Sequence, residues 1–590
     1  MDGNNDNHNQ NRKHNFPTQL LLNLRRNPAQ PLVHCGELQY SACQLLYKVH
    51  ILTLALRSHD VRAGDAVGVC MQRGPELLAA MLALWQLGAV YVPLEPQLPR
   101  ERLRLYSESA ALTLLLVQET LQHIADSLPL PVVVVLPPVS STLGCPTVHE
   151  LLECSREVAA AAPAYVMFTS GSSGQPKGVV LSHANLAGFF AAVSTLWSPP
   201  SRWRYLACAS IGFDISLFEL LAPLAFDGEL VVASDDDVHD PPALLDLIAR
   251  QHVDVVQATP SLWQLLALYP WPLAARPQLA ISIGEALGKG LAHQLLERCE
   301  QVWNLYGPTE CTIWATAHRV SDTDTTLEAP PVVSIGTALA GYSASVDDSE
   351  LLLGGVGVGT GYLQPTALGT VRFIDAASGR QYRTGDACRY DSTGNLHFLG
   401  RFDTQVIING YRIELDEIEE ALRSHDSILQ AACVAKPQQH TPQASQLLAF
   451  IVCRPGAPNK DANRFNRWLA DSLPAWMLPH RYFVVDSLPL TLSGKTDRKA
   501  LLALAETDNS DQLEAMDDVV RVLAEIFCDV LEVPKVGLND SFFDLGGSSM
   551  LSATLVLTIN QRFASNISLR KALVTPPTVR SLAALLQQAN

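Results

Sequence analysis

Residues 165–180 read YVMFTSGSSGQPKGVV, an apolar, strand-like run that leads into a loop of glycine, serine and threonine ending at a lysine. Hydroxyl donors, glycines that let backbone N–H groups approach an anion, and one ammonium group make this loop a candidate phosphate cradle. Its members are Thr169, Ser170, Gly171, Ser172, Ser173, Gly174, Lys177 and Gly178. Pro176 stands where the G-x-x-x-x-G-K-[ST] motif needs glycine, so the usual P-loop fold does not follow. A flexible surface loop is the alternative, but the apolar runs on both sides favour an anchored one.

The loop TSGSSGQPKG (169–178) resembles the signature loop of the adenylate-forming superfamily, which holds acyl-CoA ligases, luciferases and the adenylation domains of nonribosomal peptide synthetases. Further stretches resemble motifs of this family and follow in the family's order. They are LWQLGAVYVPLEP (84–96), FDIS (213–216), NLYGPTE (304–310), YRTGD (382–386), GRFDTQVIINGYRIELDEIE (400–419), LPAWMLP (473–479) and LSGKTDRKAL (492–501). Together they span the chain from about residue 20 to residue 505. The resemblance implies an adenylation domain.

Composition limits the class of protein. The 590 residues are about four domains' worth of chain, and a hydrophobic content of 48% indicates large buried cores. The formal charge of −17 would repel a polyanion, so we expect no nucleic-acid partner. The twelve cysteines form no CxxC pair, which is typical of reduced thiols in a cytosol. Residues 1–15 are too polar for a signal peptide, and the longest apolar runs are short and broken by proline. We therefore expect a soluble, cytoplasmic protein without a membrane partner.

Apolar runs of strand length alternate with helix-periodic segments through the first part of the chain. Three such units are 65–71 followed by 75–88, 252–260 followed by 261–268, and 277–284 followed by 285–299. This alternation predicts an α/β fold with mostly parallel sheets covered by helices, and with the chemistry in loops that follow strands. The stretch SASVDDSELLLGG (343–355) is shorter than the family's usual strand pair, which leaves the topology near residue 345 open.

The predicted organisation has five parts. They are a disordered tail (1–16), a large N-terminal adenylation subdomain (17–402), a small, mobile α+β C-terminal subdomain (403–505), an acidic linker (506–514) and a carrier domain (515–590). Amphipathic periodicity at 519–531, 549–563 and 578–588 predicts that the last part is an all-α four-helix bundle.

Within the last part, FFDLGGSSMLSATL (542–555) resembles the attachment motif of peptidyl carrier domains, D-x-F-F-x-x-G-G-x-S. The resemblance implies that Ser549 takes a covalent 4′-phosphopantetheine arm. A plain helix N-cap is the alternative reading of GGSS. The position after an adenylation domain favours attachment, because tethering gives an effective concentration of order mM.

The resemblance also assigns roles around ATP and Mg²⁺. The loop residues from Thr169 to Lys177 would hold the β- and γ-phosphates, which must be shielded while a carboxylate attacks the α-phosphorus. Tyr306 would lie against adenine, Thr309 would contact the α-phosphate, and Glu310 would bind Mg²⁺. Asp386 would accept hydrogen bonds from both ribose hydroxyls, and Arg401 would support the same side.

Two further residues match mobile parts of the family. Lys495 matches the catalytic lysine that bridges the α-phosphate and the substrate carboxylate in the closed adenylation state. Asp403 matches the hinge about which the small domain turns between adenylation and thiolation.

The motif FDIS separates the branches of the superfamily. Asp214 matches the carboxylate that pairs with the α-ammonium group in amino-acid-activating members. The family's side-chain pocket carries over to Ile215, Phe218, Gln257, Ile281, Ile283, Leu305, Ile313 and Trp314. This lining is apolar and has no charged group, so it predicts a small or medium aliphatic L-amino acid. Valine is the specific prediction, with isoleucine, leucine, alanine and proline left open because a methylene changes binding by only ~1–3 kcal/mol.

The sequence therefore predicts an ATP-dependent ligase that makes an aminoacyl adenylate and loads it on its own carrier thiol. Its expected partners are an amino acid, a phosphopantetheinyl transferase, and a synthetase module or tailoring enzyme that takes the loaded carrier in trans in secondary-metabolite biosynthesis. One rival is a ligase for acyl or aryl acids with a fused carrier. The other is a catalytically silent scaffold, against which the intact Lys177, Glu310, Asp386, Lys495 and Ser549 speak.

Overall fold

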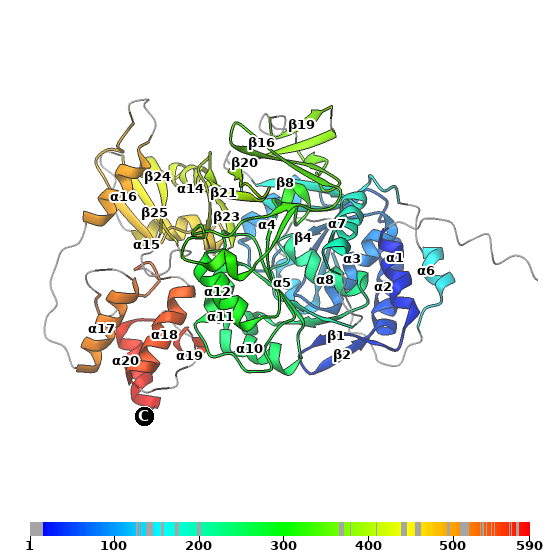
Figure 1. The fold of residues 1–590 in the computed structure, drawn as a ribbon, viewed down its shortest axis with the longest axis horizontal. Helices are drawn as coiled ribbons and strands as arrows, with labels where there is room; N and C mark the ends of the chain where they lie inside the picture. Colours follow the sequence, from blue (N-terminus) through cyan, green and yellow to red (C-terminus); the bar gives the residue numbers. More distant parts are fainter. Residues whose placement is uncertain are drawn as a thin grey trace, which may run out of the picture.

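A computed structural model gives the fold in three units that follow one another along the chain (Figure 1). The large α/β unit runs from blue to green, the small unit is yellow, and a group of helices is orange to red. The structure describes residues 16–125, 128, 130, 133–136, 145–154, 158–171, 176–197, 202–364, 371–377, 379–408, 410–437, 445–454, 462–491, 496–507, 518–531, 533, 536–538, 540–543, 545–547, 549–563, 565, 567, 569–573 and 577–589.

The first sheet of the large unit has nine strands in the order β15-β14-β13-β12-β11-β9-β10-β1-β2. The strands in the middle of this order, from β13 to β1, pair in parallel, and β2, β14 and β15 pair antiparallel at the two edges. The strands are β1 (Pro31–Cys35), β2 (Leu38–Ser41), β9 (Arg204–Ala207), β10 (Glu229–Val232), β11 (Val255–Ala258), β12 (Leu279–Ser282), β13 (Val302–Tyr306), β14 (Thr316–Arg319) and β15 (Thr337–Ala338). Every residue of β10, β11 and β12 is buried, as expected of parallel strands covered on both faces.

The second sheet of the large unit has seven strands in the order β18-β8-β7-β4-β3-β5-β6. They are β3 (Ala66–Cys70), β4 (Val90–Pro93), β5 (Leu114–Gln118), β6 (Val133–Leu136), β7 (Pro163–Thr169), β8 (Lys177–Ser182) and β18 (Gly361–Tyr362). Strands β7 and β8 pair antiparallel, with Thr169 opposite Lys177. The candidate phosphate loop therefore closes a hairpin, which agrees with the prediction that it is anchored and is not a P-loop.

A third, antiparallel sheet contains β16 (Tyr342–Asp347), β17 (Glu350–Gly355), β19 (Phe373–Ala376), β20 (Gly379–Tyr390) and β21 (Leu396–Arg401). The short stretch near residue 345 keeps a strand pair, with Asp347 opposite Glu350. Asp348 and Ser349 both have positive φ, +46° and +69°, as a two-residue type I′ hairpin turn requires. A tight turn thus replaces a longer connection without changing the pairing, which answers the question that the sequence left open.

Helices cover the sheets of the large unit, as the alternation predicted. Those used below are α2 (Ala42–Ser58), α3 (Pro75–Leu87), α4 (Arg100–Ser109), α7 (His183–Leu196), α8 (Ile215–Ala225), α11 (Pro260–Ala267) and α12 (Lys289–Arg298). The predicted pairs β3–α3, β11–α11 and β12–α12 are confirmed. Helix α3 is apolar and almost entirely buried, begins with Pro75 and ends at Gly88, whose φ of +73° is the left-handed cap that glycine favours.

The small unit begins with a hairpin of β22 (Gln405–Ile408) and β23 (Tyr411–Glu414), which leads into α14 (Leu415–Arg423). A three-stranded sheet follows, made of β24 (Ile428–Pro437), β25 (Ser445–Cys453) and β26 (Arg481–Val484), with α15 (Ala462–Ala470) and α16 (Arg498–Thr507). Fully buried Ile413, Ile418, Phe465 and Leu469 belong to its core. The predicted mixed α+β unit is confirmed.

The C-terminal unit consists of α17 (Asp518–Leu531), α18 (Ser549–Phe563), α19 (Leu569–Leu573) and α20 (Val579–Ala589). These four helices enclose their own apolar core, so the predicted helical bundle is confirmed. Leu265 and Tyr269, at and just after the end of α11, pack against this core. Gln446 Nε2 of β25 donates to the carbonyl of Gly546 at 3.3 Å. The bundle therefore contacts both the large and the small unit.

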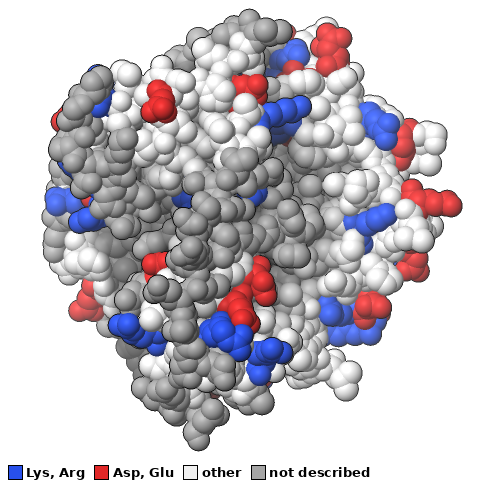
Figure 2. Space-filling view, turned by 90° about the vertical axis from the view of Figure 1, so that its left-hand side faces the viewer, with Lys and Arg blue, Asp and Glu red and all other residues white. Residues whose placement is uncertain are grey.

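The face that Figure 1 shows edge-on at its left turns toward the viewer in Figure 2. Among the residues drawn in colour on this face, basic and acidic side chains are interspersed. Within the described parts of the chain, no helix combines the length and the apolar character needed to cross a membrane.

Candidate active site

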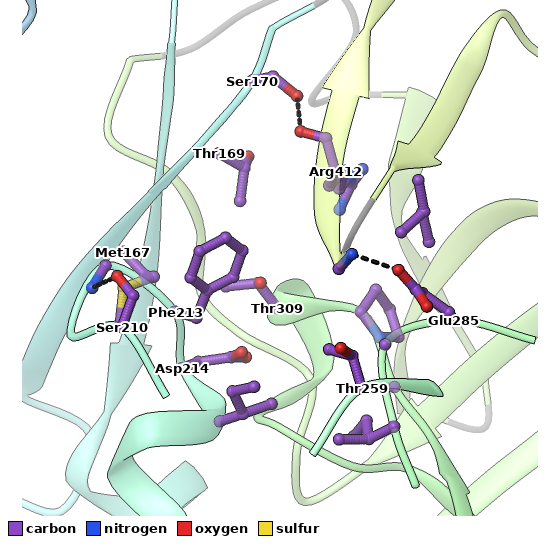
Figure 3. A pocket seen from close by; sticks show the side chains of 18 of the residues that line it. Met167, Thr169, Ser170, Ser210, Phe213, Asp214, Thr259, Glu285, Thr309 and Arg412 are labelled. Atoms are coloured by element: carbon purple, nitrogen blue, oxygen red, sulfur yellow. Dashed lines mark hydrogen bonds between the residues drawn. The ribbon is translucent and has the colours of Figure 1, made fainter. Parts of the chain in front are cut away.

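A cavity of about 230 Å³ lies between the large unit and the β22–β23 hairpin of the small unit. Of the residues predicted from the sequence, those that line it are Thr169, Ser170, Asp214, Ile215, Ile283, Leu305, Tyr306, Thr309, Asp386 and Arg401. Segments far apart in the sequence thus meet at one place, as Figure 3 shows for the strand ends, the start of α8 and the hairpin. Ser172, Ser173, Gly174 and Lys495 lie outside the described residues.

One side of the cavity holds a chain of polar contacts around Asp386. The hydroxyl of Tyr306 and the guanidinium of Arg401 each donate to one carboxylate oxygen of Asp386. Arg401 also donates to Asp403, from Nε at 2.6 Å and from Nη2 at 2.7 Å, and Arg372 donates to Asp403 at 2.9 Å. Burial raises the pKa of Asp386, although the cation of Arg401 acts in the opposite direction. The predicted ribose acceptor, its supporting arginine and the predicted hinge therefore form one network.

The candidate phosphate loop faces the small unit. The hydroxyl of Ser170 donates to the carbonyl of Arg412 at 2.9 Å, which Figure 3 shows as a dashed line. The backbone N–H of Gly171 donates to Glu417 Oε2 at 3.0 Å, and Lys177 Nζ lies 3.7 Å from Glu414 Oε1. The loop thus presents its donors to anionic or carbonyl oxygens, which is the chemistry that a phosphate cradle needs.

The Thr169 hydroxyl is buried and has no hydrogen-bond partner among the described residues. It lies between Ser170 and Phe213 in Figure 3 and lines the cavity. A buried hydroxyl without a partner costs free energy, so its position favours a ligand that supplies an acceptor.

Glu310, the predicted metal ligand, is ion-paired in this arrangement. Arg412 Nη1 donates to Glu310 Oε2 at 3.0 Å, and the Tyr362 hydroxyl donates to Oε1 at 2.9 Å. Burial alone would raise the pKa of Glu310, but the charge of Arg412 and the hydrogen bonds to the carboxylate outweigh it and lower the pKa to about 2. Glu310 is therefore ionised, and the guanidinium of Arg412 balances its charge.

Asp214 lies at the start of α8 and is 6% exposed. Its Oδ2 accepts from the backbone N–H of Ile313 at 3.2 Å. Burial raises the pKa of Asp214 to about 6, and the charge of Glu310 adds to this rise. Among the described residues, no lysine, arginine or histidine forms an ion pair with it. A buried carboxylate that faces a cavity without a cation is suited to an ammonium ligand.

The other predicted pocket positions lie behind the cavity wall. Phe218, Gln257, Ile281, Ile313 and Trp314 are at most 1% exposed, and none of them lines the cavity. The amide of Gln257 is bound by the protein itself, because its Nε2 donates to the carbonyl of Ile215 at 3.0 Å. The sequence pattern singled out these positions as pocket residues, but it did not indicate that they lie behind the wall of the cavity.

The β22–β23 hairpin is held in the cavity by contacts that the sequence did not predict. The N–H of Gly410 donates to the Glu285 carboxylate, which also accepts from the Ser261 hydroxyl at 2.8 Å. Gly410 has a φ of +82°, and a Cβ there would lie 2.7 Å from the methyl group of Thr259. Tyr411 stacks on Trp476 with ring centroids 4.3 Å apart.

These contacts define the arrangement of the small unit, in which the hairpin faces the cavity. Thr491 and Thr496, the described residues on either side of Lys495, are not among those that line the cavity. Arg412, Glu414 and Glu417 are functional candidates that the motifs alone did not single out. All three residues lie in the motif GYRIELDEIE, but the motif alone does not show which residues they contact.

Comparison with known proteins identifies the family. The profile of the AMP-binding enzymes matches residues 22–363, that of the AMP-binding enzyme C-terminal domain matches 417–495, and that of the phosphopantetheine attachment site matches 521–586. The chain belongs to the AMP-binding enzymes. It is an ATP-dependent adenylating ligase in which an adenylation domain is fused to a carrier domain.

Two curated relatives are similar over nearly the whole of this chain. The chain is 33% identical over 579 residues to the "Dimodular nonribosomal peptide synthase" of Bacillus subtilis (strain 168), covering 95% of this chain and 24% of that one. It is 31% identical over 584 residues to "Bacitracin synthase 2" of Bacillus licheniformis, covering 95% of this chain and 21% of that one. The chain therefore spans about a quarter or less of these curated relatives.

Two solved structures are similar in fold. One is holo-PA1221, an NRPS protein containing adenylation and PCP domains bound to a vinylsulfonamide inhibitor, with a TM-score of 0.78, 26% identity, and coverage of 97% of this chain and 96% of that one. The other is holo-AB3403, a four-domain nonribosomal peptide synthetase bound to AMP and glycine, with a TM-score of 0.59, 29% identity, and coverage of 98% and 43%.

The residues present fit the groups that the family uses. The unpartnered Thr169 hydroxyl, the Asp386 carboxylate and the aromatic Tyr306 suit a nucleotide, which brings phosphate oxygens, ribose hydroxyls and a base. ATP supplies the energy of a phosphoanhydride, and Mg²⁺ is typical of the family. Ser549 is the first residue of α18 and follows Gly547 of the attachment motif by two positions, within the segment that matches the phosphopantetheine attachment site.

Proposed function

We propose that this chain activates an amino acid with ATP as an aminoacyl adenylate and loads the acyl group onto the arm of its own carrier domain. The observation that carries the proposal is Asp214, a buried carboxylate that faces the cavity of the nucleotide residues and pairs with no described cation. A carboxylate there repels a plain carboxylic acid but attracts the α-ammonium group of an amino acid.

In the first half-reaction, a carboxylate oxygen of the amino acid bonds to the α-phosphorus of ATP. The bond from that phosphorus to the bridging oxygen of pyrophosphate breaks, and pyrophosphate leaves. Asp214 holds the ammonium group, Thr309 and Lys495 stabilise charge at the α-phosphate, and the phosphate loop with Lys177 stabilises the leaving pyrophosphate. Glu310 would hold Mg²⁺, while Tyr306, Asp386 and Arg401 would fix the nucleoside.

In the second half-reaction, Ser549 would hold the phosphopantetheine arm, which would supply a thiol to take the acyl group from the adenylate, with AMP as the leaving group and the thiol proton released. The contacts of the carrier with Leu265, Tyr269 and Gln446 support this step, because they keep the bundle against the adenylation domain. A phosphopantetheinyl transferase installs the arm, and a partner in trans receives the acyl group.

The apolar wall formed by Ile215, Ile283 and Leu305 supports an aliphatic substrate. Within this class, the apolar sequence pattern favours valine. The similar four-domain synthetase is bound to glycine, so the smallest amino acids are candidate substrates as well.

ATP–pyrophosphate exchange with each amino acid and with the matching desamino acid tests the proposal. Exchange should need the amino group, and Asp214→Asn should lower it by ~10²-fold or more. Asp254→Asn is the matched control, because Asp254 is half-buried, accepts from the Arg204 N–H at 2.9 Å and lies outside the cavity. Equal exchange with a desamino or aryl acid would instead favour the acyl- or aryl-acid ligase.

A further inference from the structure

Two thiols and a guanidinium from distant segments meet beside helix α2, and we call them the thiol cluster. Arg25 lies in the last turn of α1 (Phe16–Arg26), Cys43 in the first turn of α2, and Cys145 shortly before α6 (Val148–Cys154). Helix α2 contacts both α1 and α6, which Figure 1 shows at its right. Nη1 of Arg25 donates to Sγ of Cys145 at 3.6 Å, and the Cys145 thiol is also a hydrogen-bond partner of the Cys43 thiol.

The backbone around Cys43 is fixed at the start of α2. Its N–H donates to the carbonyl of Pro28 at 2.7 Å. Ser41 caps the helix, because its hydroxyl accepts from the N–H of Gln44 at 3.2 Å and its own N–H donates to the Gln44 side chain at 2.8 Å. The first turn of a helix favours a negative charge, since its backbone N–H groups point outward there. The position of Cys43 therefore favours its thiolate as an attacking group.

Cys145 is held by the start of α6. The N–H of Thr147 donates to Glu150 Oε2 at 2.7 Å, and the N–H of Glu150 donates to the Thr147 hydroxyl at 3.2 Å. The carbonyl of Leu151, which is 3% exposed, accepts from Gln86 Nε2 at 3.1 Å. Helix α6 is thus anchored to α3, and the two thiols meet from two backbones that are each held in place.

Arg25 brings a positive charge to the cluster. Its Nε is buried and has no hydrogen-bond partner among the described residues, so part of its donor capacity is unused. Burial raises the pKa of Cys145 to about 11, and the contact with Cys43 adds to this rise, while the charge of Arg25 acts in the opposite direction. The share due to Cys43 disappears once that thiol is oxidised, because a disulfide sulfur carries neither a charge nor a thiol proton. The first oxidation step therefore makes the second thiol easier to ionise.

Two other half-buried thiols lack these features. Burial and the charge of Glu76 raise the pKa of Cys35, although Lys48 acts in the opposite direction, and burial with the charge of Asp529 raises the pKa of Cys528. No second thiol takes part in either shift. A neighbouring carboxylate disfavours a thiolate. The thiol cluster differs from both because it combines a second thiol with a cation.

We propose that Cys43 and Cys145 are a reversible redox site, which a small-molecule disulfide such as oxidised glutathione converts to an internal disulfide. The Cys43 thiolate bonds to one sulfur of glutathione disulfide, and the other glutathione leaves as a thiolate that takes up the proton lost by Cys43. The Cys145 sulfur then bonds to the Cys43 sulfur, and the second glutathione leaves with the proton of Cys145. Two protein thiols are thereby oxidised, and one glutathione disulfide is reduced to two thiols.

The internal disulfide closes a loop of roughly 100 residues between α2 and the segment before α6. This loop contains β3, β4, β5 and α3, so the bond restricts the unfolded chain over a large part of the second sheet. We expect the unfolding temperature to rise by about 5 °C or more on oxidation. None of the three residues of the thiol cluster lines the active-site cavity, so the inference does not depend on the proposed function.

The test incubates the full chain with a series of ratios of oxidised to reduced glutathione and then alkylates the free thiols. Peptide mass spectrometry should find one cross-linked pair, Cys43 with Cys145, and the oxidised sample should unfold at the higher temperature. Dithiothreitol should reverse both changes. A disulfide between other cysteines, or glutathione retained on Cys43 without the internal bond, would overturn the proposal.

Variants assign the effect to the cluster. Cys43→Ser and Cys145→Ser should each abolish the rise in unfolding temperature, whereas Cys35→Ser, the matched half-buried control, should keep it. Arg25→Gln should slow formation of the internal bond by ~10-fold at neutral pH and move its pH profile upward, since the thiolate fraction falls without the cation. A rise that persists in Cys145→Ser, or an unchanged rate in Arg25→Gln, contradicts the assignment. Mapping the bond in the wild-type chain needs no variant, so it decides the question where a variant does not fold.

Discussion

Asp214, the proposed ligand of the ammonium group, lowers the stability of the protein when no amino acid is bound. Burial raises its pKa from the ordinary 3.8 to about 6, so the folded chain binds this proton more tightly than the unfolded chain. Between these two values the folded state loses stability as pH rises, and the loss stays constant above about pH 6. A shift of this size corresponds to about 3 kcal/mol, since one pKa unit is about 1.36 kcal/mol.

Asp214→Asn should therefore stabilise the empty protein at about pH 8 while abolishing amino-acid-dependent exchange. The amide can still accept the N–H of Ile313, so the fold keeps that contact. Thermal unfolding at about pH 8 should shift upward for the variant, and the gain should disappear at about pH 4. A variant that is less stable than the wild type at the higher pH would show that the ionised Asp214 carboxylate does not lower the stability of the folded state.

Amino-acid binding should share the titration of Asp214. The ammonium group needs the ionised carboxylate, and the pKa of the empty site is about 6. The KM for the amino acid should therefore rise ~10-fold for each pH unit below about 6 and stay level between about pH 7 and 8. Exchange measured at a series of pH values, with ATP saturating, checks this. A KM for the amino acid that is flat down to about pH 5 would mean that another group holds the ammonium.

At the scale of elements, the β22–β23 hairpin and the first turn of α14 place charged side chains in the site. These charges have the same signs as those that Mg²⁺ and the ATP phosphates would bring there. Arg412 places a cation on Glu310, while Glu414 and Glu417 place carboxylates on Lys177 and on the N–H of Gly171. The predicted metal ligand and the phosphate loop therefore stay neutralised in this arrangement. We propose that these donors cannot hold pyrophosphate in this arrangement, so that the two half-reactions use different arrangements of the small unit.

Glu417 is the residue on which this arrangement can be tested. Its carboxylate accepts from Gly171 and forms an ion pair with Arg102 of α4, and both charged side chains are at most 4% exposed. Removing one partner of a buried ion pair costs ~3–5 kcal/mol. Glu417→Gln should therefore slow transfer from a supplied aminoacyl adenylate to the carrier by ~10²-fold or more, while ATP–pyrophosphate exchange persists.

Glu420→Gln is the matched control on the same helix, because Glu420 is 63% exposed and pairs with Arg423 at 2.7 Å. It should leave both half-reactions unchanged. Transfer is measured in a single turnover with the holo carrier, and exchange in parallel. Equal losses of transfer and exchange in Glu417→Gln would remove the distinction between the two arrangements.

Sequence patterns predicted the elements well, because the signals are local. Alternating apolar runs gave the βα units, and helical periodicity gave the carrier bundle to within a few residues. The contacts of the hairpin were not predictable in this way, since Ser170 and Arg412 are 242 positions apart. The burial of Phe218 and Trp314 behind the cavity wall was also hidden, because it depends on rings from α7, β9, α8 and the segment after residue 311 packing together.

At the scale of the whole molecule, the carrier is both tethered to the adenylation domain and seated against it, through Leu265, Tyr269 and Gln446. Incubation with coenzyme A and a phosphopantetheinyl transferase should add one arm at Ser549. Ser549→Ala should block loading and leave exchange intact, because the serine belongs to the carrier segment and not to the adenylation domain. Peptide mass spectrometry locates the arm, and a mass gain at Ser548, or none, would contradict the assignment.

We propose that the small unit also turns, because Lys495 matches the family's lysine beside the α-phosphate, whereas Thr491 and Thr496, the described residues on either side of it, do not line the cavity. In this proposal, Lys495 acts only while the acyl–phosphate bond forms. Lys495→Ala should therefore lower exchange by ~10²–10³-fold or more, yet still pass the acyl group from a supplied adenylate to the holo carrier. Single-turnover transfer, measured beside exchange, separates the two effects.

Asp403 should show the opposite pattern, because it lies at the join of the two units and binds Arg401 and Arg372. Proline restricts φ, so Asp403→Pro limits a hinge that must adopt two backbone conformations. The adenylate should form and remain untransferred. Asp403→Ala removes the same ion pairs but leaves the backbone free, so it should transfer faster than Asp403→Pro. If Lys495→Ala and Asp403→Pro both lost both half-reactions equally while folded, a turning small unit would not explain the order of catalysis.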